Sequence, residues 1–451
     1  MRRGFRSLLV ALTALFLAHA AVAAPATPAY AATPFVRPAL AAIPAAAGFD
    51  SSGHLDPEAA TRAYLDLVPA DKRASSNKYF EGGYWLLLWD ALLTVAISLL
   101  LLFSGFSARL RDRAERVTRF RWIHTWIYFA AFVLVSTVLS APLTWYEGFY
   151  REHIYNQSHS GYGVWLHDQL VGLLITVLLG GLFVACLYAL VRRLPNTWHL
   201  WGTAVTVLFI ILTAMIAPVY LAPLFNTYTT IQDADVTGPV LRMAHANGIE
   251  VNKLFEVDAS RQTTQVSANV SGLFGTTRIT LNDNLLRTAS LPEIEAVTGH
   301  EMGHYVLNHV AKSVVSSVLQ VFLFFTILRA WLGSMQRRWA PRWGTRAIDD
   351  VALLPAAVLA ISVISLLFTP IDKTLTRTQE YEADMYGINA SRQPDGFAQS
   401  MLKLGQYRKL DPTPLEEFLF YDHPSGHTRI RAAMRWKSQN AEAVKACAGY
   451  P

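Results

Sequence analysis

Six long apolar segments constrain the fold of this chain more than any other feature. Each is close to the ~20 residues that a helix needs to cross the hydrocarbon core of a membrane. They lie at about 84–104, 122–145, 165–191, 199–222, 313–333 and 350–371. Hydrophobic residues make up 52% of the 451 residues and charged residues only 16%, which is too apolar for an ordinary soluble chain. The sequence therefore predicts a mainly α, polytopic membrane protein.

The N-terminus "MRRGFRSLLVALTALFLAHAAVAAPA" has a basic start, a short apolar centre and small residues at Ala21 and Ala23. This pattern is typical of a secretory signal peptide, here residues 1–23, and an uncleaved first span is the alternative. An Ala/Pro-rich stretch opens the following segment. The rest of the chain then divides into an exported leader, four spans, a catalytic segment, two spans and a second catalytic segment: 24–83, 84–222, 223–312, 313–371 and 372–451.

The arginines predict how these segments are oriented, because short cytoplasmic loops carry the excess of Lys and Arg. Arginines cluster in the first, third and last of the loops between spans: Arg109, Arg111, Arg113, Arg116, Arg119, Arg121, Arg192, Arg193, Arg337, Arg338, Arg342 and Arg346. The second loop has only Arg151, against Glu147 and Glu152. We therefore expect 223–312 and 372–451 to lie outside the cytoplasm, as on the periplasmic face of a bacterial inner membrane. The same arginines explain the net charge of +6, so we expect no nucleic-acid partner.

The stretch "HEMGH" carries the chemistry. On an α-helix, residues i and i+4 share a face, so His300 and His304 can both point a ring nitrogen at one zinc ion, with Glu301 beside them to take a proton from water. Leu307 and Val310 occupy the positions where metzincins continue their motif. We expect His309, which is one residue out of helical phase, to be an ordinary polar residue.

A further ligand must come from elsewhere, and the stretch "TRTQEYEADMYG" after the last span is the best source. Glu380 and Asp384 are four residues apart and share a helical face, whereas Glu382 lies about 200° around the helix from Glu380. We predict that Glu380 is the third zinc ligand. Asp384 would accept a hydrogen bond from a ligating histidine and orient its ring. One Zn²⁺ per chain is expected.

The combination of HExxH, ExxxD and flanking spans resembles the integral-membrane zinc endopeptidases of the CAAX prenyl protease type 1 family. "IAPVYLAPLFNTYTTI" and "YDHPSGHTRI" are similar to the family's entry into its catalytic domain and to its downstream His-Pro and Arg element. The resemblance implies a zincin-like α+β catalytic domain interrupted by the last two spans. It also implies that His423 stabilises the oxyanion, that Arg429 braces the site, and that Asn269 belongs to the stretch before the strand that receives substrate.

These observations predict a membrane-embedded zinc endopeptidase that cleaves membrane-associated or exported proteins and peptides. An extended substrate would pair with the strand around Arg278 to Leu281. A catalytically silent membrane scaffold or chaperone is one alternative. A metal-dependent transporter is the other, although only isolated ionisable residues such as Asp90 and Asp168 lie near or within the spans. The sequence leaves the oligomeric state open.

Overall fold

The computed structural model describes residues 38–40, 48–272 and 277–443. The signal-like segment 1–23 and Cys447 lie outside these residues. Up to residue 224 the elements are helical: α2 (Pro57–Leu65), α3 (Ala70–Phe103), α4 (Phe106–Val117), α5 (Arg121–Trp145), η2 (Tyr146–Arg151), α6 (Glu152–Ile154), α7 (Tyr162–Ile175), η3 (Thr176–Gly180), α8 (Gly181–Arg193), α9 (Trp198–Ile216), η4 (Ala217–Leu221) and η5 (Ala222–Leu224).

The part of the chain that follows adds four short strands and a second set of helices. The strands are β1 (Tyr228–Thr230), β2 (Leu254–Val257), β3 (Ala268–Ser271) and β4 (Arg278–Asn282). The helices are α10 (Ala234–Ala246), η6 (Ala259–Arg261), α11 (Asp283–Thr288), α12 (Leu291–Val306), α13 (His309–Trp343), η7 (Val351–Leu353), α14 (Leu354–Ser391), α15 (Pro394–Leu404), α16 (Pro414–Phe420) and α17 (Gly426–Gln439).

Six helical stretches are long and apolar enough to cross a membrane, and they confirm the six predicted spans. They run over Ala70–Phe103, Arg121–Ile154, Tyr162–Arg193, Trp198–Leu224, His309–Trp343 and Val351–Ser391. Several of these helices extend past the apolar segments into polar sequence. Helix α3 thus begins at Ala70, inside the predicted leader, and α14 continues to Ser391, so that Glu380 and Asp384 lie on the same helix as the last span.

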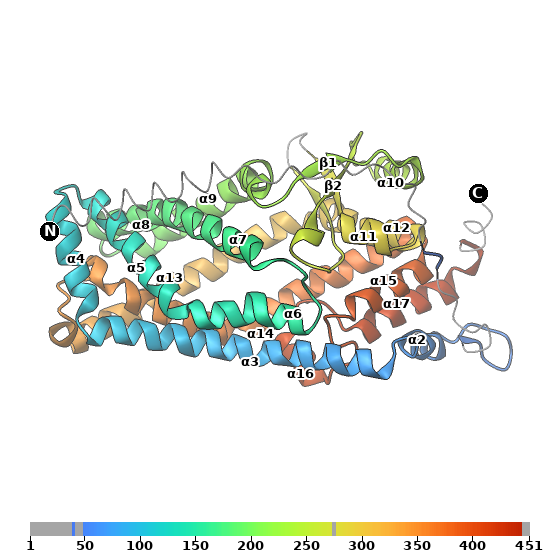
Figure 1. Cartoon of the computed structure of the whole chain (residues 1–451), viewed down its shortest axis with the longest axis horizontal. Coiled ribbons are helices and arrows are strands. Elements are labelled where there is room, and N and C mark those ends of the chain that lie inside the picture. Colours follow the sequence, from blue (N-terminus) through green and yellow to red (C-terminus); the bar gives the residue numbers. More distant parts are fainter. Residues whose placement is uncertain (1–37, 41–47, 273–276, 444–451) are drawn as a thin grey trace. The chain divides into compact units, whose positions relative to one another are not determined.

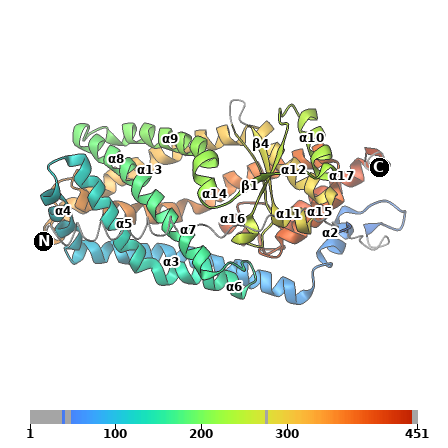
Figure 2. The same cartoon turned by 45° about the horizontal axis from the view of Figure 1, so that its top comes forward.

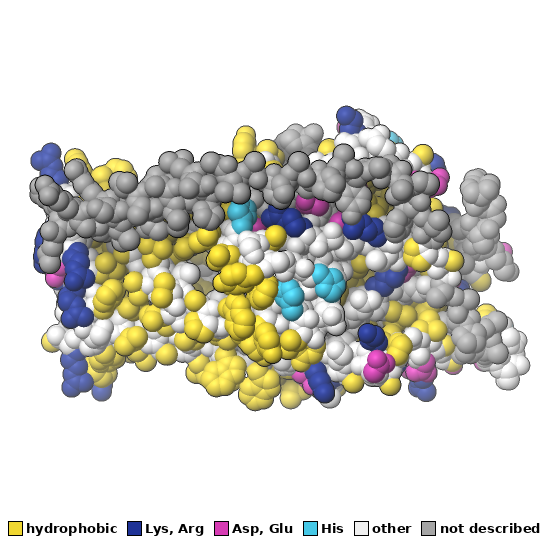
Figure 3. All heavy atoms as spheres, in the orientation of Figure 1, with side chains coloured by type: hydrophobic (Ala, Val, Ile, Leu, Met, Phe, Trp, Pro, Cys, Tyr) yellow, Lys and Arg dark blue, Asp and Glu magenta, His cyan; other side chains and the backbone are white. Residues whose placement is uncertain are grey.

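Two of the three loops predicted to share the cytoplasmic side, the first and the last, lie in contact with one another. Arg111 of α4 forms a buried ion pair with Asp350, which immediately precedes η7. Arg346 of the last loop likewise forms ion pairs with two carboxylates of α4. The nitrogen–oxygen distances are 2.8 Å to Glu115 and 3.0 Å to Asp112. On the face shown in Figure 3, Lys and Arg side chains gather at the end of the bundle where α4 lies, next to a broad hydrophobic surface.

The four strands form one sheet in the order β1-β2-β4-β3, beside α11 and α12 (Figure 1, Figure 2). Strand β4 pairs in parallel with β2 on one side and antiparallel with β3 on the other. The prediction that substrate pairs along Arg278 to Leu281 is therefore wrong, because both edges of β4 are already hydrogen-bonded within the sheet. The free edge on this side belongs to β3.

Helix α12 is packed on two sides by separate hydrophobic clusters. On one side, the buried Ile294 and Met302 join Ile279 and Leu281 of the sheet. On the other, Ala296 joins a cluster formed by α2, α15 and α17. Burial of these apolar side chains is the main stabilising term. It fixes α12 between the sheet and the C-terminal helices.

Candidate active site

Helix α12 positions the histidine motif, and its first turn is capped by its own residues. The backbone N–H of Ser290 donates to Glu293 Oε2 at 2.7 Å, which completes a capping box. Pro292 lies in the first turn, where its missing N–H is not needed. These residues set the start of the helix. Three turns later the helix presents His300, Glu301 and His304.

Helix α14 approaches α12 at glycines, so that the two backbones touch. A Cβ atom on Gly299 would lie 2.9 Å from the carbonyl oxygen of Gly387, and one on Gly303 would lie 3.0 Å from the Cα of Ala383. Gly299 and Gly303 form a small-xxx-small pair, the pattern that lets helices pack at close range. Sequence reasoning missed this contact, although the signal was present within "TGHEMGH" itself.

This close packing brings the three predicted ligands together. Glu380 Oε2 lies 3.2 Å from His300 Nε2, and Glu380 Oε1 lies 3.4 Å from His304 Nε2. One ligand atom from each of the three residues can be chosen so that all lie within 4.8 Å of one another. Glu380 Oε2 is buried and accepts no well-formed hydrogen bond. Two imidazole nitrogens and a carboxylate with an unsatisfied oxygen form a donor set that fits Zn²⁺.

The protonation of His300 and Glu301 reflects their burial and their neighbours. Burial opposes a charge on His300, but its contacts with the carboxylates of Asp384 and Glu380 outweigh burial and raise the pKa of the ring to about 9. Burial also raises the pKa of Glu301, which makes its carboxylate a stronger proton acceptor.

Asp384 and Arg429 support His300 from behind. His300 Nδ1 lies 2.8 Å from Asp384 Oδ1, which leaves Nε2 to face Glu380. Arg429 donates through Nε to Asp384 Oδ2 at 2.8 Å and through Nη2 to Oδ1. The Asp384 side chain is fully buried and that of Arg429 is 4% exposed, so each charge depends on the other for compensation. Burial opposes the charge of Arg429, but Asp384 raises its pKa above the usual value.

His423 precedes α17 and faces the carboxylate of Glu380. Its Nε2 lies 3.0 Å from Glu380 Oε2, and its Nδ1 lies 2.7 Å from Asp422 Oδ1. Burial opposes the charge of Asp422, but the hydrogen bond with His423 and the cations Lys373 and Arg408 hold its pKa well below the usual range. The imidazole is therefore held between two carboxylates, with its Nε2 at the edge of the candidate metal site.

His309 is not the ordinary polar residue that the sequence predicted. Its side chain is 3% exposed and its Nδ1 lies 2.9 Å from Nδ1 of His304. The prediction assumed that one continuous helix runs through residues 307–309. In the structure α12 ends at Val306 and α13 begins at His309, and Asn308 between them has a left-handed φ of 56°. This break changes the direction of the chain, so that His309 contacts His304.

A cavity of about 530 Å³ lies beside the candidate metal site and is lined by one of the three candidate ligands, His300. Ser267 and Ala268, at the start of β3, form part of one wall. Phe397, Met401 and Leu404, on or at the end of α15, contribute an apolar wall. His300, Glu301, His423 and Arg429 also line it. Asn269 lies in β3 opposite Thr280, one residue beyond the wall.

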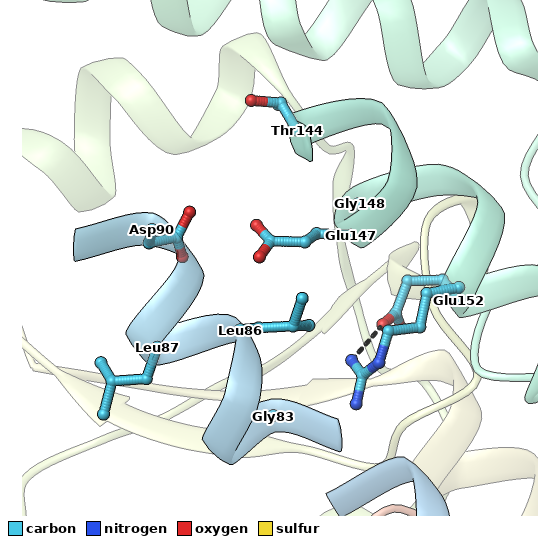
Figure 4. Close-up of a pocket in the computed structure, with 9 residues that line it drawn as sticks. Gly83, Leu86, Leu87, Asp90, Thr144, Glu147, Gly148 and Glu152 are labelled. Carbon is cyan, nitrogen blue, oxygen red and sulfur yellow. Dashed lines mark ion pairs between the residues drawn. The ribbon is translucent and has the colours of Figure 1, made fainter. Parts of the chain in front are cut away.

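The ionisable residues near the spans lie apart from this site. Asp90 of α3 and Glu147 of η2 point toward one another in a shallow hollow (Figure 4). Asp168 of α7 instead accepts hydrogen bonds from Gln262 Nε2 at 2.8 Å and Arg261 Nη2 at 3.1 Å, which ties the third span to η6. Within the described residues, the His–Glu group that could hold a metal contains neither Asp90 nor Asp168.

A histidine–carboxylate group that could hold a metal, together with six helices long and apolar enough to cross a membrane, fits the class of multi-pass membrane metallopeptidases. Residues 230–437 match peptidase family M48, and residues 57–227 match the region described as CAAX prenyl protease N-terminal, five membrane helices. The chain belongs to the CAAX prenyl protease type 1 family. The predicted activity, metal-dependent cleavage of peptide bonds, is confirmed at this level, and nothing favours the scaffold or transporter alternatives.

Individual relatives agree with this assignment. The chain is 29% identical over 343 residues to the uncharacterized metalloprotease YhfN of Bacillus subtilis, covering 76% of this chain and 80% of the relative. It is 25% identical over 319 residues to CAAX prenyl protease 1 of Saccharomyces cerevisiae, covering 66% and 69%. The fold matches the crystal structure of S. mikatae Ste24p with a TM-score of 0.69 at 21% identity, covering 82% of this chain and 90% of that one.

Proposed function

We propose that this protein binds one Zn²⁺ through His300, His304 and Glu380 and hydrolyses peptide bonds in membrane-associated or exported substrates. The observation that carries the proposal is the convergence of His300, His304 and Glu380, which can each offer one ligand atom so that all three atoms lie within 4.8 Å of one another. A bound zinc ion supplies Lewis-acid chemistry, which polarises a carbonyl and lowers the pKa of water toward ~7. The side chains around the ion would transfer the proton, stabilise the oxyanion and orient the ligands.

Glu301 is the general base in this proposal. It follows His300 on the same turn of α12 and lines the cavity where a peptide would lie. Its raised pKa favours acceptance of a proton from the attacking water. The same carboxyl group can then deliver that proton to the leaving amine.

His423 and Arg429 have separate roles. His423 Nε2 is at the rim of the site, where it can donate a hydrogen bond to the oxyanion that develops on the substrate carbonyl. Asp422 holds the ring of His423 from its other side. Arg429 acts through Asp384, which fixes the ring of His300.

The free edge of β3 is the proposed binding strand for an extended substrate. Among the residues that the structure describes, this strand pairs with β4 on one edge only, and its first residue, Ala268, lines the cavity. A peptide could add as a further strand and present a carbonyl to the metal site. Asn269 would lie beside that peptide.

We place the catalytic segments, 223–312 and 372–451, on the non-cytoplasmic face of a bacterial inner membrane. The arginine-rich loops support this orientation, and the contact between Arg346 and α4 is consistent with both loops lying on one side. Substrates would then be exported or membrane-linked proteins. The yeast and plant relatives carry the name CAAX prenyl protease, but the proposed orientation argues against a cytosolic prenylated substrate for this chain.

The decisive experiment measures metal and activity together on the full-length protein in detergent. We expect about one zinc per chain and cleavage of an internally quenched peptide that is lost on chelation and restored by zinc. Cleavage that continues after the metal has been stripped would overturn the proposal. A zinc-loaded protein that cleaves no peptide in a broad library would also overturn it.

A further inference from the structure

His304 is held from behind by a chain of two side chains that no part of the proposed mechanism uses. Its Nε2 faces Glu380 and His300. Its Nδ1 points the other way and lies 2.9 Å from Nδ1 of His309. Nε2 of His309 in turn lies 3.0 Å from Glu382 Oε2.

The contact between two ring nitrogens restricts where the protons can be. When Nδ1 of one imidazole lies at hydrogen-bond distance from Nδ1 of another, one must donate and the other must accept. A metal at Nε2 of His304 requires the lone pair there, so the proton of this ring is on Nδ1. His309 Nδ1 therefore accepts, and the proton of His309 is on Nε2, from which it donates to Glu382.

The surroundings of His309 keep this arrangement in place. Its side chain is 3% exposed. The two rings meet edge to face, with centroids 5.0 Å apart and an angle of 74° between planes. Glu382 is 44% exposed, and Lys312 donates to the same carboxylate oxygen at 2.6 Å, which holds the acceptor beneath His309.

The two histidines of the motif are therefore supported differently. His300 contacts the carboxylate Asp384 directly, whereas an imidazole separates His304 from Glu382. We propose that His309 is a positioning residue that fixes the tautomer and ring orientation of His304, and that Glu382 fixes the tautomer of His309. This proposal rests on the proposed zinc function and adds two residues to it.

Groups that orient a metal-binding histidine from behind typically contribute a factor of 10 to 100 in metal affinity. We therefore expect His309→Leu, which fills the space but accepts no hydrogen bond, to weaken zinc binding by about 10- to 100-fold. His309→Asn carries an oxygen near the position of Nδ1, and we expect it to recover most of that loss. Glu382→Leu should weaken binding less than His309→Leu, and Glu382→Gln, which still offers an acceptor, should stay close to wild type.

The test is a zinc titration against a chromophoric chelator of known affinity, at one fixed pH, on the purified full-length protein. The visible absorption spectrum of the cobalt-substituted protein provides a second readout, because it reports ligand geometry without requiring activity. Val315→Ala is the matched control, because this side chain lies on the same helix as His309 and is 71% exposed, and we expect wild-type affinity from it. Melting temperatures of the metal-free variants verify folding.

Several results would overturn the inference. One is wild-type zinc affinity in His309→Leu, and another is equal loss in His309→Asn and His309→Leu, which would show that the acceptor is irrelevant. Should His309→Leu fail to fold, the comparison of Glu382→Leu with Glu382→Gln decides, because that side chain is largely exposed, and equal affinities would refute the proposal. A wild-type protein that binds no zinc would refute the proposed function instead.

Discussion

The backbones of His300 and Gly387 are in contact: a Cβ atom at position 387 would lie 2.5 Å from the amide nitrogen of His300. This contact joins the helix that carries the histidine motif to the helix that carries Glu380. The distance between the two helices, and hence the size of the metal site, depends on the absence of a side chain at this position. A methyl group there must push the helices apart.

Gly387→Ala should therefore lower zinc stoichiometry and the melting temperature. In an unobstructed helix, Gly to Ala stabilises by about 0.5–1 kcal/mol, but overpacking a tight contact costs about 1–3 kcal/mol. Metal content and thermal denaturation in detergent measure the effect. Gly172→Ala is the control, because a Cβ there meets nothing within 4 Å. Unchanged metal content in Gly387→Ala would contradict the role of the contact.

Local patterns in the sequence were sufficient to predict the spans and to choose the ligands. Apolar length revealed the six membrane helices, and helical spacing selected His300, His304 and Glu380 as candidates for one site. These are properties of single segments, so no knowledge of distant contacts was needed. The roles of the three side chains in binding metal stay predictions.

Features that depend on long-range contacts could not be predicted in this way. The position of β4 inside the sheet depends on pairing with both β2 and β3, which alternation of residue types within one strand does not reveal. The role of His309 was hidden by the left-handed turn at Asn308, because counting 100° per residue assumes an unbroken helix. The first error came from a long-range contact, and the second came from a change in chain direction at Asn308.

Replacement of the general base should separate metal binding from catalysis. We expect Glu301→Gln to keep zinc bound and to lower kcat/KM by about 10²- to 10⁴-fold, the usual contribution of a general acid–base group. Zinc content and peptide cleavage are measured on the same preparation. Glu250→Gln, at an exposed position between α10 and β2, should leave both unchanged. Near-normal cleavage by Glu301→Gln would mean that another group is the base.

Loss of Arg429 should destabilise the protein, because it leaves the buried Asp384 without its cation. Removing one partner of a buried ion pair costs about 3–5 kcal/mol, so Arg429→Met should lower the melting temperature markedly. Arg429→Lys keeps the charge but cannot donate from both Nε and Nη2, and we expect an intermediate value. Arg435→Met, on the exposed face of the same helix, is the control. Equal melting temperatures for Arg429→Met and Arg435→Met would show that the pair contributes nothing.

The free edge of β3 can be tested by removing one backbone donor. Ser267 uses its carbonyl to accept from Asn282, and alternation along an antiparallel pair then directs the N–H of Ala268 away from β4. Ala268→Pro deletes that N–H. If the substrate pairs there, KM should rise by about 3- to 10-fold, which corresponds to one hydrogen bond. Ala268→Ser retains the N–H and should stay near wild type, and an unaltered KM in the proline variant would argue against strand addition.

The orientation in the membrane can be tested by labelling single cysteines on intact cells. The first, third and last loops between spans lie on the same side of the membrane, so one orientation places all the arginine clusters in the cytoplasm. The opposite orientation would place every cluster outside the cytoplasm, against the usual excess of Lys and Arg in cytoplasmic loops. The contact of Arg346 with Glu115 agrees with a common side for two of these loops. Val117 at the end of α4 is 54% exposed, and Ser438 near the end of α17 is also exposed.

In a background with Cys186→Ala and Cys447→Ala, we expect Ser438→Cys to react with a membrane-impermeant thiol reagent while Val117→Cys does not. The outer membrane, if the cells have one, is permeabilised first. After lysis both cysteines should react to the same extent, which shows that each is accessible once the inner membrane no longer protects it. Labelling of Val117→Cys alone on intact cells would place the catalytic segments in the cytoplasm, and substrates would then have to be sought on that side of the membrane.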